Sequence, residues 1–288
     1  MVLFLGLFSK NKYQPFFLPG LIVLTIPEFI LHAGVVSTDM SLAFCVMVVM
    51  LSFWKCLNSE KHIFWNYLFF AGLGLGLLAK GPIIFILTIP PILLWTIITN
   101  QYSKVFNSFS WFLGILITCV IALPWYYLSE KATPGFIDYF IIGEHFKRFF
   151  DSGWSGDKYG FPKSQPIGMI WVFLLLFSLP WIVLILKKLW SNRWQLKNDP
   201  WLLFLIVWLL WTPIFFTFSS SLIHPYILPV MVPMALLVTH WWKSITYKKI
   251  YVSIGFLIPV LSCIILIVSL ITNDLQYYSK TDKYLLKT

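Results

Sequence analysis

The stretch MSLAFCVMVVMLSFWKCL, residues 40–57, contains a single charge, Lys55. About 20 apolar residues in a helix are needed to cross the hydrocarbon core of a bilayer. Lipid offers no partner to backbone amides, so a stretch of this kind must form a helix. Comparable stretches recur along the chain, and we expect about nine spans, at residues 16–36, 40–57, 64–79, 82–98, 108–128, 168–187, 200–218, 222–242 and 250–272.

The composition agrees with a membrane protein. The 288 residues are 59% hydrophobic and 11% charged, whereas a soluble domain has about 25% charged residues. The net charge of +10 therefore indicates basic loops near anionic lipid head groups rather than a nucleic-acid partner. The cysteines have no CxxC spacing, and we expect neither a metal site nor a disulfide framework from them. They are Cys45, Cys56, Cys119 and Cys263.

The distribution of positive charge predicts an orientation. Most Lys and Arg residues of the short loops lie on one side of the expected bundle, and the short turns of the other side contain one, Lys80. Because cytoplasmic loops carry the excess of Lys and Arg, we expect the basic side to be cytoplasmic. The 129–165 loop, the 219–224 turn and the 273–288 tail then face outward. We expect one transmembrane bundle over residues 1–272, followed by that short extracytoplasmic tail.

The first residues suggest a longer protein. Residues 1–8 are apolar but too short to span, and Lys10 and Lys12 follow them. A signal peptide has its positive charge before the apolar run, not after it. We interpret this segment as the end of a span that begins upstream.

The 129–165 loop has a helical pattern at residues 134–150. Phe136, Phe140, Ile141 and Phe146 could share an apolar face opposite charged residues. This pattern is typical of a helix that lies in the plane of the membrane interface. The expected fold class is thus an all-α polytopic membrane protein with an outer-face interfacial helix in this loop.

Two tight turns contain candidate site residues. Asp39 follows Ser37 and Thr38 between two spans and could be a helix N-cap, or a carboxylate that positions a hydroxyl or transfers a proton. Lys80, in the turn Ala-Lys-Gly-Pro, could be a lysine that snorkels from a helix end, or the partner of an anionic lipid phosphate.

The outer loop adds a denser group, Glu144-His145-x-x-Arg148. On a helix, Glu144 and Arg148 are i,i+4 and could pair with each other. Alternatively, Arg148 and Lys147 bind phosphate while Glu144 or His145 faces the substrate. A metal site from this group alone is not favoured, because no second ligand pair has suitable spacing.

Glu28 and His32 lie within the first full expected span, four residues apart on one face. An ionisable residue inside a span is a functional hypothesis by default. A proton relay is one interpretation. A structural pair that closes a polar gap in the bundle is the favoured one.

With these residues placed, the chain resembles the GT-C membrane glycosyltransferases of the protein O-mannosyltransferase and aminoarabinose (lipid A) transferase type. The resemblance covers about residues 16–242, and five short motifs occur in the family's order. They are Thr38-Asp39-Met40 with Leu42-Ala43-Phe44, Leu78-Ala79-Lys80-Gly81-Pro82, Ala122-Leu123-Pro124-Trp125-Tyr126, Pro134-Gly135-Phe136 through Glu144-His145 to Arg148-Phe149, and Phe218-Ser219 running to Tyr226-Ile227-Leu228-Pro229.

The resemblance implies a polyprenyl-phosphate sugar as donor and an inverting transfer at the outer face of the membrane to a lipid, protein or glycan acceptor. It implies no nucleotide-sugar, and no cofactor is firmly implied, with a divalent metal left open. The implied site residues are Asp39 and Glu144 for catalysis, Lys80, Arg148, His224 and Tyr226 for the donor phosphate, and His145 and Lys158 for the acceptor or loop.

The chain departs from the family pattern at two places. The principal acid of the family lies in a first outer loop, and this sequence has no matching loop. The family also has a lysine just before the Tyr-x-x-Pro segment, where Leu222 stands here, and His224 is the nearby substitute. We therefore expect the principal catalytic base to lie outside these 288 residues.

Two other functions remain open from the sequence. One is a transporter or flippase of polyprenyl-linked glycans, although we find no clear internal repeat of the kind that transporters show. The other is an inactive glycosyltransferase fragment. The absence of N-x-Ser/Thr sequons and of a luminal domain favours a bacterial inner membrane as the location.

Overall fold

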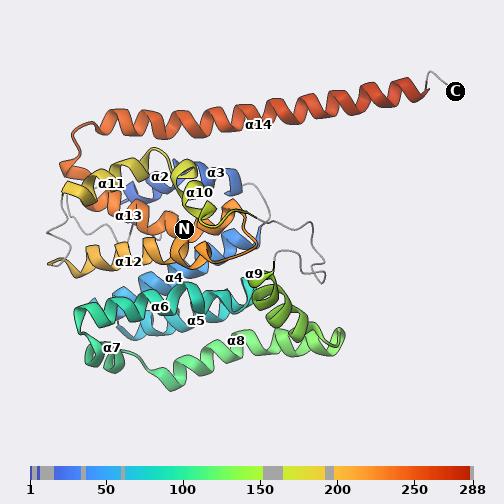
Figure 1. Cartoon of the computed structure of the whole chain (residues 1–288). Coiled ribbons are helices and arrows are strands. Elements are labelled where there is room, and N and C mark those ends of the chain that lie inside the picture. Colours follow the sequence, from blue (N-terminus) through green and yellow to red (C-terminus); the bar gives the residue numbers. More distant parts are fainter. Residues whose placement is uncertain are drawn as a thin grey trace.

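The computed structural model describes residues 1, 5–6, 16–33, 37–59, 62–151, 165–191 and 198–285. Every regular element in these ranges is a helix (Figure 1). The helices are α2 (Leu18–Leu24), α3 (Pro27–Ala33), α4 (Thr38–Asn58), α5 (His62–Lys80), α6 (Ile83–Thr99), α7 (Tyr102–Ser108), α8 (Trp111–Ala132), η1 (Asp138–Lys147), α9 (Arg148–Phe150), α10 (Met169–Phe177), α11 (Trp181–Ser191), α12 (Pro200–Thr217), η3 (His224–Val230), α13 (Met231–Trp241), η4 (Trp242–Ser244) and α14 (Lys248–Leu285).

The expected number of nine spans is not confirmed. Among the described residues, six helical segments are long and apolar enough to cross a membrane, and each corresponds to an expected span. They are Thr38–Asn58, His62–Lys80, Trp111–Ala132, Pro200–Thr217, His224–Ser244 and Lys248–Ile265. These segments and their composition make the chain a multi-pass membrane protein.

Prolines account for two of the three remaining differences. The expected span 16–36 is divided into α2 and α3, and α3 begins at Pro27, whose missing N–H and fixed φ suit a first helical turn. The expected span 168–187 is bent by 104° between α10 and α11, next to Pro180, which cannot continue an α-helical hydrogen-bond ladder. Helix α6 is apolar but has only 17 residues.

Helix α4 lies at the centre of the core. It packs against α5, α6 and η3, and most of its side chains are buried. Glycines of α5 allow close contact with its neighbours: a Cβ added at Gly72 would lie 2.9 Å from Val49 Cγ2 of α4, and one added at Gly74 would lie 2.9 Å from Ile121 Cβ of α8. The small residues thus let α4, α5 and α8 approach as transmembrane helices commonly do.

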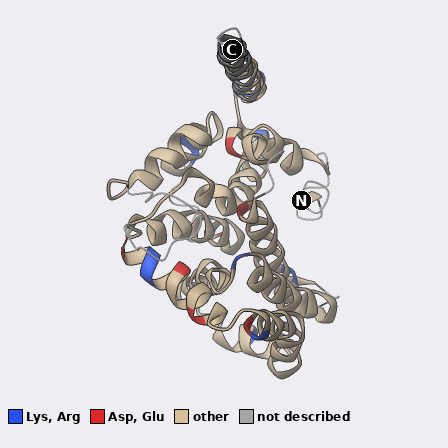
Figure 2. Ribbon diagram, turned by 90° about the vertical axis from the view of Figure 1, so that its right-hand side faces the viewer, with Lys and Arg blue, Asp and Glu red and all other residues tan. Residues whose placement is uncertain are grey.

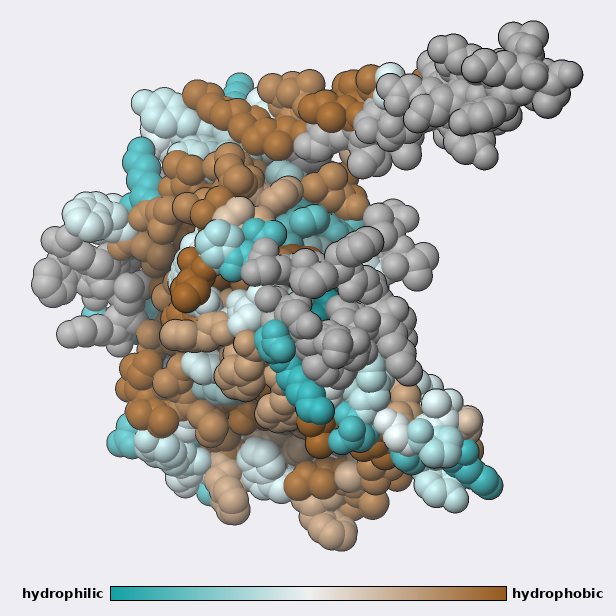
Figure 3. Space-filling view, turned by 45° about the vertical axis from the view of Figure 1, so that its right-hand side comes forward, coloured by the Kyte–Doolittle hydropathy of each residue, from teal (hydrophilic) through white to brown (hydrophobic). Residues whose placement is uncertain are grey.

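The edges of the bundle expose apolar surface. In Figure 1, α8 runs along one edge and α14 along the opposite edge. Helix α8 leaves Phe112 81%, Val120 64% and Leu123 58% exposed. Figure 3 shows apolar side chains over much of the described surface, and Figure 2 shows how sparse the charged residues are. A contiguous apolar surface of this kind is costly in water and fits a lipid environment.

A tryptophan of α12 compensates for a proline inside α6. Pro90 has no N–H, so the carbonyl of Ile86, one turn earlier, loses its helical donor. The indole Nε1–H of Trp211 donates to that carbonyl oxygen at 2.7 Å. Because lipid offers no replacement donor, this bond satisfies the carbonyl and joins α6 to α12.

We expect Trp211→Phe to destabilise the protein by about 1–3 kcal/mol, the cost of an unsatisfied buried acceptor. Adding Pro90→Ala should recover part of that loss, because the restored N–H donates to Ile86. Thermal unfolding of both variants in detergent measures the effect. Trp190→Phe is the control, because Trp190 is exposed. Equal unfolding temperatures for Trp211→Phe and the control would contradict this role.

Candidate active site

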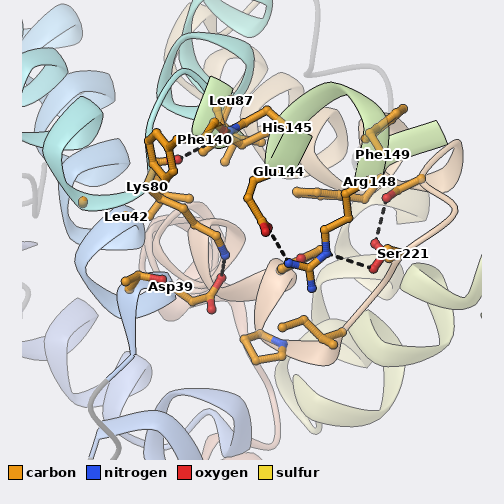
Figure 4. Close-up of a pocket in the computed structure, with 18 of the residues that line it drawn as sticks. Asp39, Leu42, Lys80, Leu87, Phe140, Glu144, His145, Arg148, Phe149 and Ser221 are labelled. Atoms are coloured by element: carbon orange, nitrogen blue, oxygen red, sulfur yellow. Dashed lines mark hydrogen bonds and ion pairs between the residues drawn. The ribbon is translucent and has the colours of Figure 1, made fainter. Parts of the chain in front are cut away.

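A cavity of about 570 Å³ opens between the ends of several helices. It lies where α4 begins and α5 ends, and η1, α9 and the 219–226 segment complete its walls. Figure 4 shows the charged side chains that enter it. Its lining also includes apolar side chains, among them Leu42 and Leu87.

The first charged group of the cavity joins the start of α4 to the end of α5. Ser37 is the N-cap of α4: its Oγ accepts from the Asp39 backbone N–H at 3.1 Å and donates to Asp39 Oδ2 at 3.2 Å. Asp39 itself lies in the first helical turn and forms an ion pair with Lys80 in the last turn of α5. Both charges therefore lie at the helix ends where the macrodipoles favour them. The N-cap interpretation of Asp39 was wrong, because Ser37 occupies that position.

Lys80 has two further contacts in the cavity. Its Nζ lies 4.6 Å from the centre of the Tyr226 ring, within the range of a cation–π interaction. Its backbone carbonyl oxygen lies 2.7 Å from His145 Nε2, and His145 Nδ1 lies 2.7 Å from the carbonyl oxygen of Phe140. His145 thus binds the end of α5 to η1. A Cβ at Gly81 (φ +73°) would lie 2.7 Å from the His145 ring, which explains a glycine at this turn.

The expected interfacial helix is a π-helix, η1, in its central part. Its i→i+5 pattern continues to the Arg148 N–H, which donates to the Gly143 carbonyl. A π-helix has more residues per turn than the α-helix that the sequence pattern predicts. Phe136 and Phe140 stack with ring centres 5.4 Å apart above the cavity, whereas Phe146 is 55% exposed.

The second charged group comes from η1 and α9. Arg148 Nη1 donates to Glu144 Oε2 at 2.8 Å, so the expected i,i+4 pair is confirmed. Tyr139 Oη donates to the other carboxylate oxygen of Glu144 at 2.5 Å. Arg148 Nε donates to Ser221 Oγ at 3.4 Å. The guanidinium is therefore oriented by two elements that are far apart in the sequence.

The 219–221 segment is bound to α9 through its backbone as well. The Ser220 N–H donates to the Phe149 carbonyl and its Oγ–H donates to the Phe150 carbonyl, both at 2.8 Å. Phe149 also stacks on Phe215 of α12 at 4.9 Å. These contacts fix the position of Arg148 at the cavity wall. Ser221 and Tyr139 are not among the predicted site residues. Ser221 is 73 residues from Arg148, and Tyr139 reaches Glu144 over five residues of a π-helix, a spacing that an α-helical pattern does not predict.

The two pairs leave the cavity with balanced charge. The side chains of Asp39, Lys80, Glu144 and Arg148 are between 12% and 26% exposed. In such a partly dry environment an opposite charge is a strong partner. An anionic ligand that enters the cavity can therefore replace the carboxylates as the partner of Lys80 and Arg148. The carboxylates then become available to accept hydrogen bonds from other groups.

The remaining predicted site residues are more scattered. Tyr226 lines the cavity, as expected. The imidazole of His224 does not: its Nδ1 lies 3.0 Å from Glu28 Oε1 in α3, although Ile223 and Pro225 on either side do line it. Leu222, which stands at the position of the family lysine, is buried. Lys158 lies outside the described residues.

We expect Asp39→Asn to destabilise the protein by about 1–3 kcal/mol, because it removes the charged partner of the partly buried Lys80. The double variant Asp39→Asn, Lys80→Met should lose less, since no unpaired charge remains. Thermal unfolding of the two single variants and the double variant gives the coupling energy. Additive losses would show that the ion pair contributes nothing to stability.

Comparisons with known proteins agree with the resemblance. Residues 2–140 match the family described as dolichyl-phosphate-mannose-protein mannosyltransferase. The chain is 27% identical over 216 residues to undecaprenyl phosphate-alpha-4-amino-4-deoxy-L-arabinose arabinosyl transferase 2 of Pseudomonas fluorescens, with coverage of 73% of this chain and 37% of that protein. It is 31% identical over 173 residues to the transferase 2 of the same description from Proteus mirabilis, with coverage of 58% and 29%.

The fold also has a solved counterpart. The crystal structure of ArnT from Cupriavidus metallidurans bound to undecaprenyl phosphate superposes with a TM-score of 0.71 at 23% identity, over 84% of this chain and 43% of that one. The expected resemblance to these glycosyltransferases is therefore confirmed. The chain spans about 37% of the length of the first of these relatives.

Proposed function

We propose, from the mannosyltransferase-family match and the charged cavity, that the chain forms the donor-binding core of a membrane glycosyltransferase. The substrate is a sugar linked to a polyprenyl phosphate, and the acceptor is a hydroxyl group of a lipid, protein or glycan. The observation that carries the proposal is the cavity in which Lys80 and Arg148, from two separate elements, face the same apolar-walled space. The relatives' names specify an undecaprenyl-phosphate donor for those proteins.

The cations suit the donor phosphate. A guanidinium binds phosphate through two N–H groups, and an ammonium binds it as a point charge. Both cations of the cavity are paired with carboxylates in the present structure. On donor binding, the phosphate replaces the carboxylates as the partner of these cations, and the ring of Tyr226 stays against Lys80. The isoprenoid chain then follows the apolar wall toward Leu42 and Leu87.

The transfer is a single displacement at the anomeric carbon. The acceptor oxygen forms its bond to that carbon while the bond from carbon to phosphate oxygen breaks, so the configuration inverts. The electron pair of the broken bond leaves with the polyprenyl phosphate, whose negative charge increases. Lys80 and Arg148 stabilise this developing charge, which is the kind of contact that lowers a reaction barrier most. The proton of the acceptor hydroxyl passes to a carboxylate.

Asp39 and Glu144 are the proposed carboxylates within this chain. Each is held by a hydrogen bond that fixes its second oxygen, to Ser37 and Tyr139 respectively. When the phosphate binds Lys80 and Arg148 in place of the carboxylates, each carboxylate can orient the acceptor hydroxyl. Asp39 and Glu144 thus position the hydroxyl, and either carboxylate can accept its proton. His145, bound to two carbonyl oxygens, holds Lys80 in place.

The proposed location is the outer face of a bacterial inner membrane. The orientation rests on the excess of Lys and Arg at the opposite end of the bundle. The donor lipid and the acceptor then meet where α4 begins and α5 ends. Lys158 and the rest of the outer loop are the proposed contacts for the acceptor.

We expect Arg148→Ala to lower sugar transfer roughly 100-fold, because one donor to the leaving phosphate is lost. Arg148→Lys should recover only part of it, since an ammonium lacks the bidentate geometry. The assay is transfer from a radiolabelled undecaprenyl-phosphate sugar in proteoliposomes. Lys188→Ala is the control, because Lys188 binds Ser244, which the cavity does not include.

Activity that is equal in Arg148→Ala and Lys188→Ala would remove Arg148 from the site. Movement of the labelled lipid between leaflets without transfer would favour a flippase instead. Absence of both activities from the unsubstituted chain would favour an inactive fragment.

The orientation has its own test. In a variant without the native cysteines, we expect Thr133→Cys, at the end of α8, to react with a membrane-impermeant maleimide added to intact cells. Lys188→Cys should react only after the membrane is permeabilised. Labelling of both positions from the same side would contradict the proposed topology.

A further inference from the structure

Two helices meet at a second polar group, which the donor cavity does not include. Glu28 and His32 lie on α3, and His224 begins η3, 196 residues after Glu28. His224 Nδ1 lies 3.0 Å and 3.2 Å from the two carboxylate oxygens of Glu28. His32 Nδ1 lies 3.1 Å from Glu28 Oε1. None of the three residues lines the donor cavity.

The three side chains have the chemistry of a transition-metal site. One potential ligand atom from each residue lies within 4.8 Å of the others. Ligand atoms at roughly 2.0–2.1 Å from a tetrahedral zinc ion are separated by about 3.4 Å, close to the contacts of Glu28 with the two imidazoles. Two histidines and one glutamate also form a known zinc ligand set that leaves a fourth position for water.

Burial makes a cation at this place favourable. The side chain of Glu28 is 0% exposed, and His32 is 11% exposed. A carboxylate without compensation inside an apolar bundle is costly. The two imidazoles contact the carboxylate as hydrogen-bond partners. A divalent cation supplies the charge and uses the lone pairs of both rings.

The surroundings orient the rings and leave a path for entry. The His224 ring stacks on Phe177 of α10 with centres 4.9 Å apart and 18° between the planes. His32 Nδ1 also lies 3.1 Å from the Glu28 backbone carbonyl, and metal binding through this nitrogen replaces that contact. His224 has a side-chain exposure of 41%, so an ion can reach the site from the solvent side.

We propose that Glu28, His32 and His224 bind a divalent transition-metal ion of the zinc class. The ion joins α3 to η3 and holds the segment in which Ile223, Pro225 and Tyr226 line the donor cavity. Its role is positional, since the ligands do not enter that cavity. The metal site does not depend on the proposed transferase function, and either can fail without the other.

The test is metal binding by the full chain, purified in detergent without a polyhistidine tag and stripped with EDTA. We expect one Zn²⁺ per chain by elemental analysis after desalting, and an intense visible spectrum of tetrahedral type with Co²⁺. Zn²⁺ should also raise the unfolding temperature. In His224→Gln, affinity for Zn²⁺ should fall at least about 10-fold, and the Co²⁺ bands should be lost.

Two further variants make the result specific. His32→Gln should behave like His224→Gln. His240→Gln should bind as the unsubstituted chain does, since His240 lies 3.7 Å from Asp199 in a histidine–carboxylate pair that does not include Glu28. Gel filtration of each variant checks that it is folded, and the exposed position of His224 makes its substitution the mildest.

Two results would overturn the proposal. Absence of stoichiometric Zn²⁺ and of Co²⁺ bands in the folded, unsubstituted chain would show that the group is only a hydrogen-bonded cluster. Binding that survives in both His32→Gln and His224→Gln would place the metal elsewhere.

Discussion

Asp39 and Lys80 form an ion pair at the point where α4 begins and α5 ends, and the geometry of the cavity depends on it. The pair joins two helices whose buried side chains are mostly apolar. The hydrophobic effect is non-directional, whereas an ion pair is favourable only where its two charges lie close together. The pair thus fixes where the two helix ends meet along their axes. His145 binds η1 to the same end of α5 through the Lys80 carbonyl.

Charge balance connects this constraint to the proposed chemistry. Each cation of the cavity is paired with a carboxylate from its own neighbourhood, Lys80 with Asp39 and Arg148 with Glu144. This arrangement balances the charges of the two pairs inside an apolar bundle. It also makes the arrival of a phosphate an exchange of partners, in which the cations gain a stronger anion and the carboxylates become available to a hydroxyl. The same principle, a buried carboxylate that needs compensation, leads from Glu28 to the proposed metal site.

The sequence predicted the helical class, because long apolar stretches have no other way to satisfy their backbone in lipid. It did not predict which of the apolar stretches form one continuous helix and which are interrupted. Pro27 begins a new helix within the expected span 16–36, while Pro90 stays inside α6 because Trp211 replaces the missing donor. Local sequence does not distinguish these outcomes, since both depend on what a neighbouring helix offers. The local sequence likewise did not predict the π-helical turn of η1.

By itself the sequence determined where most of the apolar helices lie, which residues carry charge, and the pairs set by helical spacing, Glu144 with Arg148 and Glu28 with His32. Only the tertiary structure decided the partners across the chain: Lys80 with Asp39, 41 residues apart, Arg148 with Ser221, 73 apart, and His224 with Glu28, 196 apart. The physical reason is the separation along the chain over which a sequence pattern specifies neighbours. Helical periodicity sets neighbours within about four residues, whereas contacts between helices follow from how whole apolar faces pack, which a pattern of single residues does not record.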